Sequence, residues 1–160
     1  MKMEHVALNV KDPVAMAAWY ERYLGLKVVR KLDKHPFTHF LADDGATMLM
    51  EIYNNPPDAV PPYATMDPLL LHLAFATSDP AADKAALIAA GAKAVDETKL
   101  PDGSLVIMLR DPWGLAIQLC WRTKPMLGGD RCSSSGRRTA RGLRRGVAPA
   151  CILRNSKSGL

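Results

Sequence analysis

Four polar residues stand at positions where their neighbours predict β-strands, and their side chains together have the chemistry of a metal site. They are His5, Glu51, His72 and Gln118. In each case the apolar neighbours alternate onto the opposite face of the predicted strand. Two imidazoles, one carboxylate and one amide oxygen make a mixed nitrogen and oxygen donor set. Such a set suits a divalent ion of Ni, Zn, Fe, Mn or Co with coordination positions left open.

An internal repeat sorts these four residues into two pairs. The stretch that begins at His5 returns at His72, an offset of 72 − 5 = 67 residues, and Glu51 aligns with Gln118 at the same offset. A lone His or Glu on a strand is more often an ordinary exposed or packed residue, and that interpretation stays open. The shared offset favours the metal site, because unrelated residues have no reason to keep one spacing.

The repeat unit predicts a strand, a helix and three further strands. Asp12-Pro13 and Asp79-Pro80 are expected to start the helices, since Asp caps free N–H groups and Pro suits the first helical position. Gly25 and Gly91 are expected to end them. Alternation of apolar residues predicts strands at residues 4–10, 26–32, 37–42 and 47–53, and again at residues 70–77, 92–97, 104–110 and 115–122.

The sequence therefore predicts an α+β fold in residues 1–127, built from two βαβββ modules at about residues 3–53 and 70–122. Neither module buries its sheet alone, so we expect the two to pack together about a pseudo-two-fold axis. A Pro-rich linker, residues 54–69, is expected to contain no regular element. Residues 128–160 are rich in Arg, Gly and Ser without periodicity, which predicts a basic, disordered tail.

The charge is unevenly distributed along the chain. Residues 1–124 hold 13 basic and 15 acidic residues, a net charge of 13 − 15 = −2, and residues 125–160 hold 8 and 1, a net of 8 − 1 = +7. The basic excess lies in the tail, so no nucleic-acid binding is expected of the folded domain. No apolar run is long enough to span a bilayer. The start has no secretory pattern and the three cysteines suggest no disulfide framework, which predicts a cytoplasmic protein.

Three further residues are candidates for contact with a small-molecule substrate. Asn9 shares the predicted face of His5. Tyr53 shares the predicted face of Glu51 and either lines the pocket or packs against the linker. His39 lies near the start of a predicted strand and either points into the proposed site or is simply exposed.

These patterns resemble the vicinal oxygen chelate superfamily, which includes glyoxalase I, bleomycin-resistance proteins and extradiol dioxygenases. The resemblance covers about residues 3–124 and is carried by the two His strands, the Asp-Pro helix starts, Gly25-Leu26 and the segment Arg110 to Leu119. It implies that the paired modules form a cupped mixed sheet and that the metal ligands come from the first and last strands of each module. Those positions fall on His5, Glu51, His72 and Gln118. It also implies a homodimer whose copies exchange or share modules.

The resemblance further implies a metal-dependent enzyme of the glyoxalase I-like (lactoylglutathione lyase-like) group. Such an enzyme performs an enediolate-type proton transfer on a substrate with vicinal oxygens, with Glu51 as the catalytic base. Gln118 departs from glyoxalase I, which usually has a second Glu there, and a neutral amide takes no proton. Two alternatives stay open. One is an extradiol-type dioxygenase, which needs two His and one carboxylate; the other is a non-catalytic, bleomycin-resistance-like binding protein.

Overall fold

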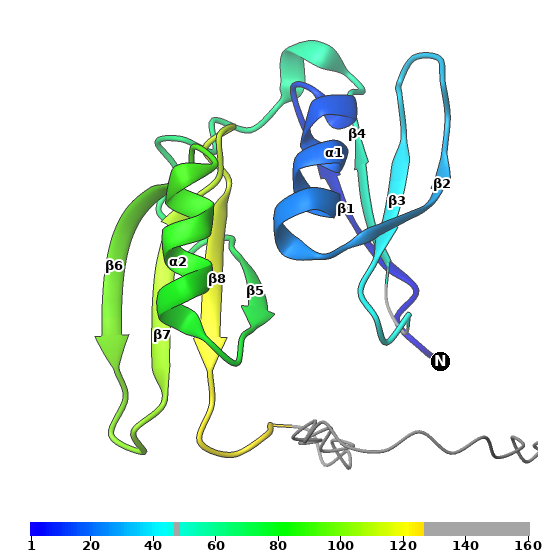
Figure 1. The fold of residues 1–160 in the computed structure, drawn as a ribbon. Coiled ribbons are helices and arrows are strands. Elements are labelled where there is room, and N and C mark those ends of the chain that lie inside the picture. Colours follow the sequence, from blue (N-terminus) through cyan, green and yellow to red (C-terminus); the bar gives the residue numbers. More distant parts are fainter. Residues whose placement is uncertain (47–48, 127–160) are drawn as a thin grey trace, which may run out of the picture. The chain divides into compact units, whose positions relative to one another are not determined.

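The computed structural model describes residues 1–46 and 49–126. The predicted tail, residues 128–160, lies outside the described residues, as do Thr47 and Met48 at the start of the predicted fourth strand. The described chain has two βαβββ modules (Figure 1), and the predicted α+β fold is confirmed. The first module contains β1 (His5–Asn9), α1 (Pro13–Leu24), β2 (Lys27–Lys31), β3 (His39–Ala42) and β4 (Leu49–Tyr53). The second contains β5 (Leu73–Ala76), α2 (Pro80–Ala89), β6 (Lys93–Lys99), β7 (Leu105–Arg110) and β8 (Ala116–Trp121).

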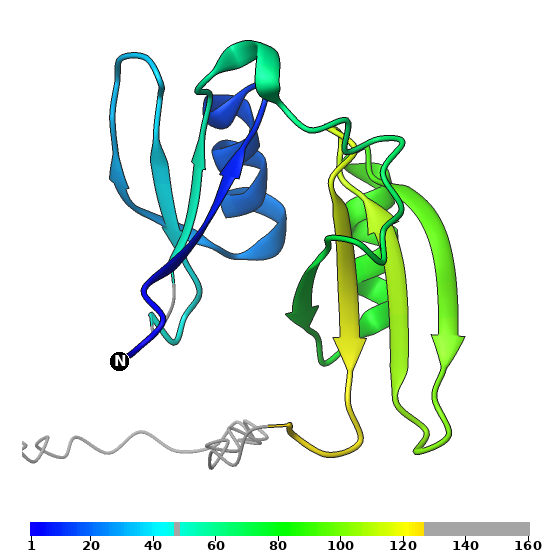
Figure 2. The ribbon, with the colours of Figure 1, turned by 180° about the vertical axis from the view of Figure 1, so that it is seen from behind.

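Each module has its own four-stranded mixed sheet. The strand orders are β1-β4-β3-β2 and β5-β8-β7-β6, so both modules have the same topology. The first and last strands of each module pair in parallel, and the other pairs are antiparallel. Each helix covers one face of its own sheet and leaves the other face open (Figures 1 and 2). We call the open face of each sheet its site face.

The internal repeat is preserved in the strand register. In the first module Ala7 lies opposite Glu51 across β1 and β4, and in the second Ala74 lies opposite Gln118 across β5 and β8. Both pairings keep the offset of 67 residues found in the sequence, since 74 − 7 = 67 and 118 − 51 = 67. Equivalent residues of the two modules therefore occupy equivalent places on their sheets.

The two helices start in the same way. The Asp12 side chain accepts a hydrogen bond from the Ala15 backbone N–H at 3.0 Å, and the Asp79 side chain accepts one from Ala82 at 3.1 Å. A proline follows each cap at the first helical position, where no backbone donor is lost. The predicted starts are thus confirmed, and each carries the chain from the end of one strand onto the covered face of the sheet.

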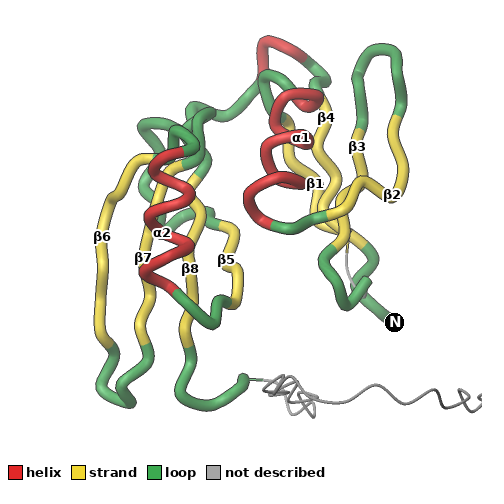
Figure 3. The backbone as a smooth tube through the Cα atoms, viewed as in Figure 1, coloured by secondary structure: helices red, strands yellow, loops and turns green. Residues whose placement is uncertain are grey.

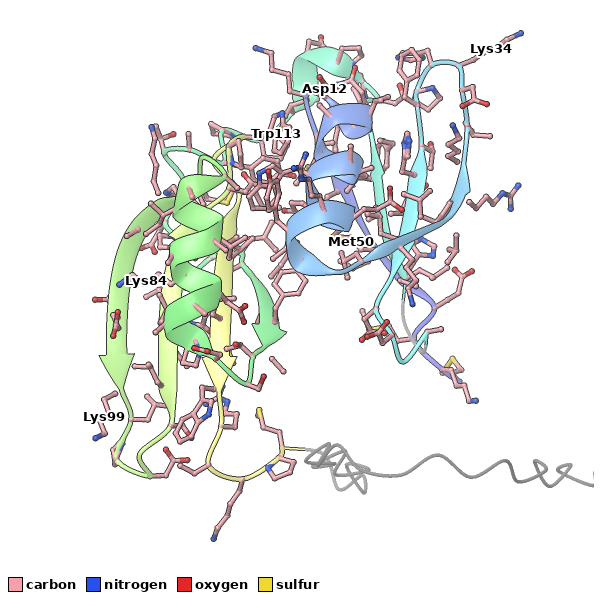
Figure 4. The ribbon with its side chains drawn as sticks, in the orientation of Figure 1. Asp12, Lys34, Met50, Lys84, Lys99 and Trp113 are labelled. Carbon is pink, nitrogen blue, oxygen red and sulfur yellow. The ribbon has the colours of Figure 1, made fainter. Side chains whose placement is uncertain are left out.

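Helix α1 also contacts the second module. The buried Tyr20 hydroxyl donates to Asp111 Oδ2 at 2.8 Å, and the Trp19 indole N–H donates to the Ala90 carbonyl at 2.9 Å. Trp113 packs edge-to-face on Trp19, with ring centroids 6.4 Å apart (Figure 4). The buried apolar residues of both modules belong to one core cluster. The second module thus helps to bury α1 at Trp19 and Tyr20.

The linker is more ordered than predicted. The short 3-10 helix η1 (Pro57–Ala59) lies within it (Figure 3), so the expectation of no regular element was wrong. Three residues are too few to produce a periodic pattern, and Pro57 presets the first φ angle of the turn. Further along, the Arg110 guanidinium donates to the carbonyls of Tyr63 and Met66 at 2.6 Å each and to that of Gly114 at 2.9 Å. One side chain of the second module therefore holds the linker.

No helix among the described residues is long and apolar enough to cross a membrane.

Candidate metal site

The first pair of predicted ligands lies together on the site face of the first sheet. His5 Nε2 is 3.4 Å from Glu51 Oε2. The Glu4 carboxylate contacts the other ring nitrogen, Nδ1, and since a carboxylate only accepts hydrogen bonds, Nδ1 carries a proton. In the neutral ring Nε2 then presents its lone pair toward the Glu51 oxygen. Two acceptors that face each other in this way have the donor types and the spacing of neighbouring ligands to one metal ion.

The second pair lies on the site face of the second sheet. His72 precedes β5 by one residue, and strand alternation places it on the face of Ala74, the residue opposite Gln118. Its Nδ1 donates to the Pro68 carbonyl at 2.9 Å, so in the neutral imidazole the lone pair that binds a metal is on Nε2. The Cys120 thiol donates to Gln118 Oε1 at 3.3 Å, so one acceptor position of this oxygen is already used.

The two pairs do not meet within one chain. Among residues 1–46 and 49–126, no group of three or more His, Cys, Asp and Glu side chains is placed to hold a metal ion. His72 therefore does not join His5 and Glu51. The structure contains two pairs of candidate donors, which we call the first half-site (His5 and Glu51) and the second half-site (His72 and Gln118). Two donors are too few for a tightly held divalent ion of the types that this donor set suits.

Asn9 contacts the linker, whereas Tyr53 shares a face with Glu51 as predicted. The Asn9 side-chain amide donates to the Pro56 carbonyl at 2.8 Å, and its oxygen accepts from the Asn55 backbone N–H at 2.9 Å. Asn9 thus ties the start of the linker to β1, and both ends of its amide are used. Tyr53 is half-buried, and strand alternation places it on the face of Glu51.

His39 does not lie on the site face. Its cross-strand neighbour is Ile52, it is 6% exposed, and its Nδ1 contacts the Phe37 carbonyl at 2.7 Å. Phe37 adopts a left-handed backbone conformation, so the strand starts at His39, two residues later than predicted, and Phe40 takes the place opposite Glu51. This corrects both expectations for His39, since it neither points into the site face nor is exposed.

The register identifies neighbours that the sequence analysis missed. Phe40 flanks Glu51, and Met108 flanks Gln118 at the equivalent place in the second module. Alternation within one strand contains no signal for these pairs, because it does not say which residues of two strands lie opposite each other. Glu4 was also missed, although it stands next to His5 in the sequence.

Two cavities differ in their relation to the four residues. A cavity of about 370 Å³ on the site face of the second sheet is lined in part by Gln118. A larger one of about 680 Å³, between the linker and the Trp113 turn, contains none of the four predicted ligands. The smaller cavity lies next to a half-site and the larger one does not, so cavity size alone does not indicate the candidate site.

Comparison with known proteins assigns the family. A family model described as the Glyoxalase/Bleomycin resistance protein/Dioxygenase superfamily matches residues 2–119. Among solved structures, SMU.1112c shares 28% identity, with 75% of this chain and 98% of that chain covered and a TM-score of 0.59. An antibiotic binding protein, TnmS3 from Streptomyces sp. CB03234, shares 20% identity over 76% of this chain and 95% of its own, with a TM-score of 0.60.

A lactoylglutathione lyase from Agrobacterium tumefaciens also shares the fold. It is 20% identical over 74% of this chain and 92% of its own, with a TM-score of 0.55. No curated protein matches the sequence. At such identities, the antibiotic binding protein and the lyase show a common fold and nothing about the reaction. The paired modules and the match over most of the chain establish that it belongs to the Glyoxalase/Bleomycin resistance protein/Dioxygenase superfamily.

Proposed function

We propose that this protein is a metal-dependent small-molecule enzyme of the glyoxalase I-like group. The observation that carries the proposal is the state of the two histidines. His5 and His72 both have Nδ1 occupied by an acceptor, Glu4 in one case and the Pro68 carbonyl in the other. Both Nε2 atoms are thereby kept available on the site faces, as metal-binding imidazoles require.

His5, Glu51, His72 and Gln118 would hold the ion. When bound, a divalent metal supplies Lewis acidity that polarises two neighbouring oxygens of the substrate. Glu51 takes the proton from the adjacent substrate carbon and returns it to the neighbouring one. Its side chain is 20% exposed, so it is reachable by a substrate yet partly shielded from water. Gln118 is neutral, and proton transfer is therefore confined to the face of the substrate that Glu51 contacts.

The separation of the half-sites bears on how such an enzyme is assembled. We propose a homodimer in which the first half-site of one copy meets the second half-site of the other. The open site faces of both sheets support this arrangement, because each presents its two donors on a surface that the helix of its module does not cover. A two-fold axis then generates two complete sites.

Metal analysis of the purified full chain tests the metal assignment. We expect one equivalent of divalent metal per chain in the parent and essentially none in His5→Ala, because loss of one of four ligands leaves too few donors. His35→Ala removes a histidine outside both half-sites and should retain the metal. A parent protein that cannot be loaded with Ni(II), Zn(II), Fe(II), Mn(II) or Co(II) would contradict the proposal.

Mixing two inactive variants tests the assembly. His5→Ala and His72→Ala, unfolded and refolded together, form mixed dimers in which one of the two sites has all four ligands. Random pairing then restores about a quarter of the parent metal content, whereas neither variant refolded alone regains any. If each chain completed its own site, mixing would restore nothing.

A metal-free binding protein is the second candidate. Its supporting observation is the neutral Gln118, which contributes a weak ligand and no base to the second half-site. Binding of a small molecule that is undiminished after chelation of all metal would favour this candidate over the enzyme.

A further inference from the structure

The cavity beside Gln118 is mostly apolar. Its volume of about 370 Å³ is enough for a substituted aromatic ring. Met108 and Val106 of β7 contribute to it, together with Val95 of β6 and Pro68 and Leu69 of the linker. Met108 is 6% exposed, whereas Leu69 is 79% exposed, so the cavity has a buried floor and an open rim.

The cavity is adjacent to both ligands of the second half-site. Gln118 lines the cavity directly, and Gln118 lies opposite Met108 across β8 and β7. Pro68 also lines it, and the carbonyl of Pro68 is the group that accepts the hydrogen bond from His72. A substrate whose oxygens lie at these two ligands therefore extends into this cavity rather than into the larger one by Trp113.

Two carboxylates determine the charge of the cavity. Asp67 Oδ1 accepts from the Leu69 backbone N–H at 2.9 Å, and Asp96 Oδ2 accepts from the Thr98 hydroxyl at 2.8 Å. These neutral donors position the carboxylates without cancelling their charge. No lining residue is basic, and neither carboxylate has an ion-pair partner within the described part of the chain.

An acidic residue at the Asp96 position is specific to the second module. A β-bulge between Ala94 and Asp96 shifts the register so that Asp96 faces Met108. The first module has the equivalent bulge before Arg30, which faces Phe40. The repeat therefore preserves the place of this residue on the site face but reverses its charge.

We infer that the cavity receives an apolar arm of the substrate that ends in a positively charged group such as an amine or amidinium. Asp67 and Asp96 attract such a group, and they repel a carboxylate or phosphate in the same place. The assignment of this arm to a substrate rests on the proposed function, since the neighbouring half-site is where the reacting oxygens would lie.

Three aromatic hydroxamic acids that differ only in charge test this inference. They are benzohydroxamic acid, its 4-aminomethyl derivative and its 4-carboxy derivative, each of which offers two neighbouring oxygens to a metal. Binding is measured by calorimetry on the full chain, both metal-free and Zn(II)-loaded. The ¹³C-labelled methyl signal of Met108, assigned with Met108→Leu, reports whether the ring enters the cavity.

We expect the aminomethyl compound to bind about tenfold more tightly than the carboxy compound and to shift the Met108 signal. Asp67→Asn/Asp96→Asn keeps both hydrogen-bond acceptors and should bring the affinities of all three compounds within about twofold of each other. Glu97→Gln is the matched control, because Glu97 is the next residue on β6, lies opposite Ile107 on the other face, and pairs with Lys84. It should retain the order of affinities.

Equal affinities in the parent, a preference for the carboxy compound, or an unmoved Met108 signal would each overturn the inference. So would an unchanged order in the double Asp variant. Comparison of the metal-free protein with the Zn(II)-loaded protein separates this inference from the proposed function. If affinity follows the charge order but zinc does not raise it for any compound, the cavity assignment is supported and the metal site is contradicted. If zinc raises the affinity of all three compounds but their affinities equal one another, the cavity assignment is contradicted and the metal site is supported.

Discussion

The two modules share one topology but differ in the charge of the side chains at equivalent positions. Their strand orders, helix caps and register agree, yet the equivalent residues Glu51 and Gln118 differ in charge. The histidines differ too, because His5 is backed by the Glu4 carboxylate and His72 by the neutral Pro68 carbonyl. The first module therefore supplies the anionic half of the proposed site, and the second supplies the neutral half. A repeated fold thus preserves the positions of side chains while leaving their roles free to diverge.

A second pair of equivalent residues shows the same divergence in the core. Asp44 of the first module is exposed and forms an ion pair with Lys27 at 3.0 Å. Asp111, which follows it by 111 − 44 = 67 residues, is 3% exposed and accepts from Tyr20. Burial raises the pKa of Asp111 to about 6, although its hydrogen bonds from Tyr20 and from backbone N–H groups oppose the shift. The same position is a surface ion pair in one module and a contact between modules in the other.

The largest expected effect concerns the charge difference between Glu51 and Gln118. Glu51→Gln makes the half-sites equally neutral and removes the base, so turnover should fall by about 100-fold or more. The measurement is thioester formation from the hemithioacetal of methylglyoxal and 2-mercaptoethanol. Glu97→Gln, which changes a carboxylate outside the site face, should retain the parent rate. Full activity in Glu51→Gln would remove Glu51 from the mechanism.

The next effect concerns the buried Asp111. Its folded pKa of about 6 exceeds the ordinary value of 3.8, so the folded state holds this proton more tightly than the unfolded state. The resulting stability is fully present below about pH 4 and is lost as the pH rises through about 6. This contribution amounts to roughly 3 kcal/mol in the free energy of unfolding. Urea unfolding of the parent and Asp111→Asn at several pH values isolates it as a difference. Asp44→Asn is the control, and identical pH profiles for the parent and Asp111→Asn would contradict the assignment.

A smaller effect is expected from the carboxylate behind His5. Glu4→Gln weakens the hydrogen bond that His5 Nδ1 donates and thereby makes His5 Nε2 a weaker metal ligand, so zinc affinity should fall by about tenfold. Competition with a chromophoric chelator measures this change. Glu97→Gln again serves as the control, and equal zinc affinities in the two variants would show that Glu4 does not position His5.

The smallest net change in turnover is expected when Glu51 and Gln118 are exchanged. Glu51→Gln/Gln118→Glu moves the carboxylate to the other half-site, and we expect turnover to return to within about tenfold of the parent. Because the base then lies on the other face of the substrate, the variant should consume the opposite enantiomer of the hemithioacetal. Recovery with unchanged enantiomer preference would show that the two half-sites are not on opposite sides of the substrate.

Much of the fold was predictable because its signals are local. The Asp-Pro pairs mark both helix starts, strand alternation separates covered from open faces, and the offset of 67 residues relates the modules. The same offset selected both candidate ligand pairs, and their equivalent places on the two sheets follow from it, since a repeat in sequence becomes a repeat in register. The short helix η1 and the left-handed turn at Phe37 escaped prediction, because neither spans enough residues to form a pattern.

By itself, the sequence determined the two modules, their helix starts and the four candidate ligands, all of which follow from residue spacing along the chain. Only the tertiary structure decided which residues lie opposite one another. It moved His39 to the covered face, placed Met108 beside Gln118 and left the half-sites apart within one chain. Strand alternation makes two faces but does not select a cross-strand partner. That selection depends on packing between residues far apart in sequence.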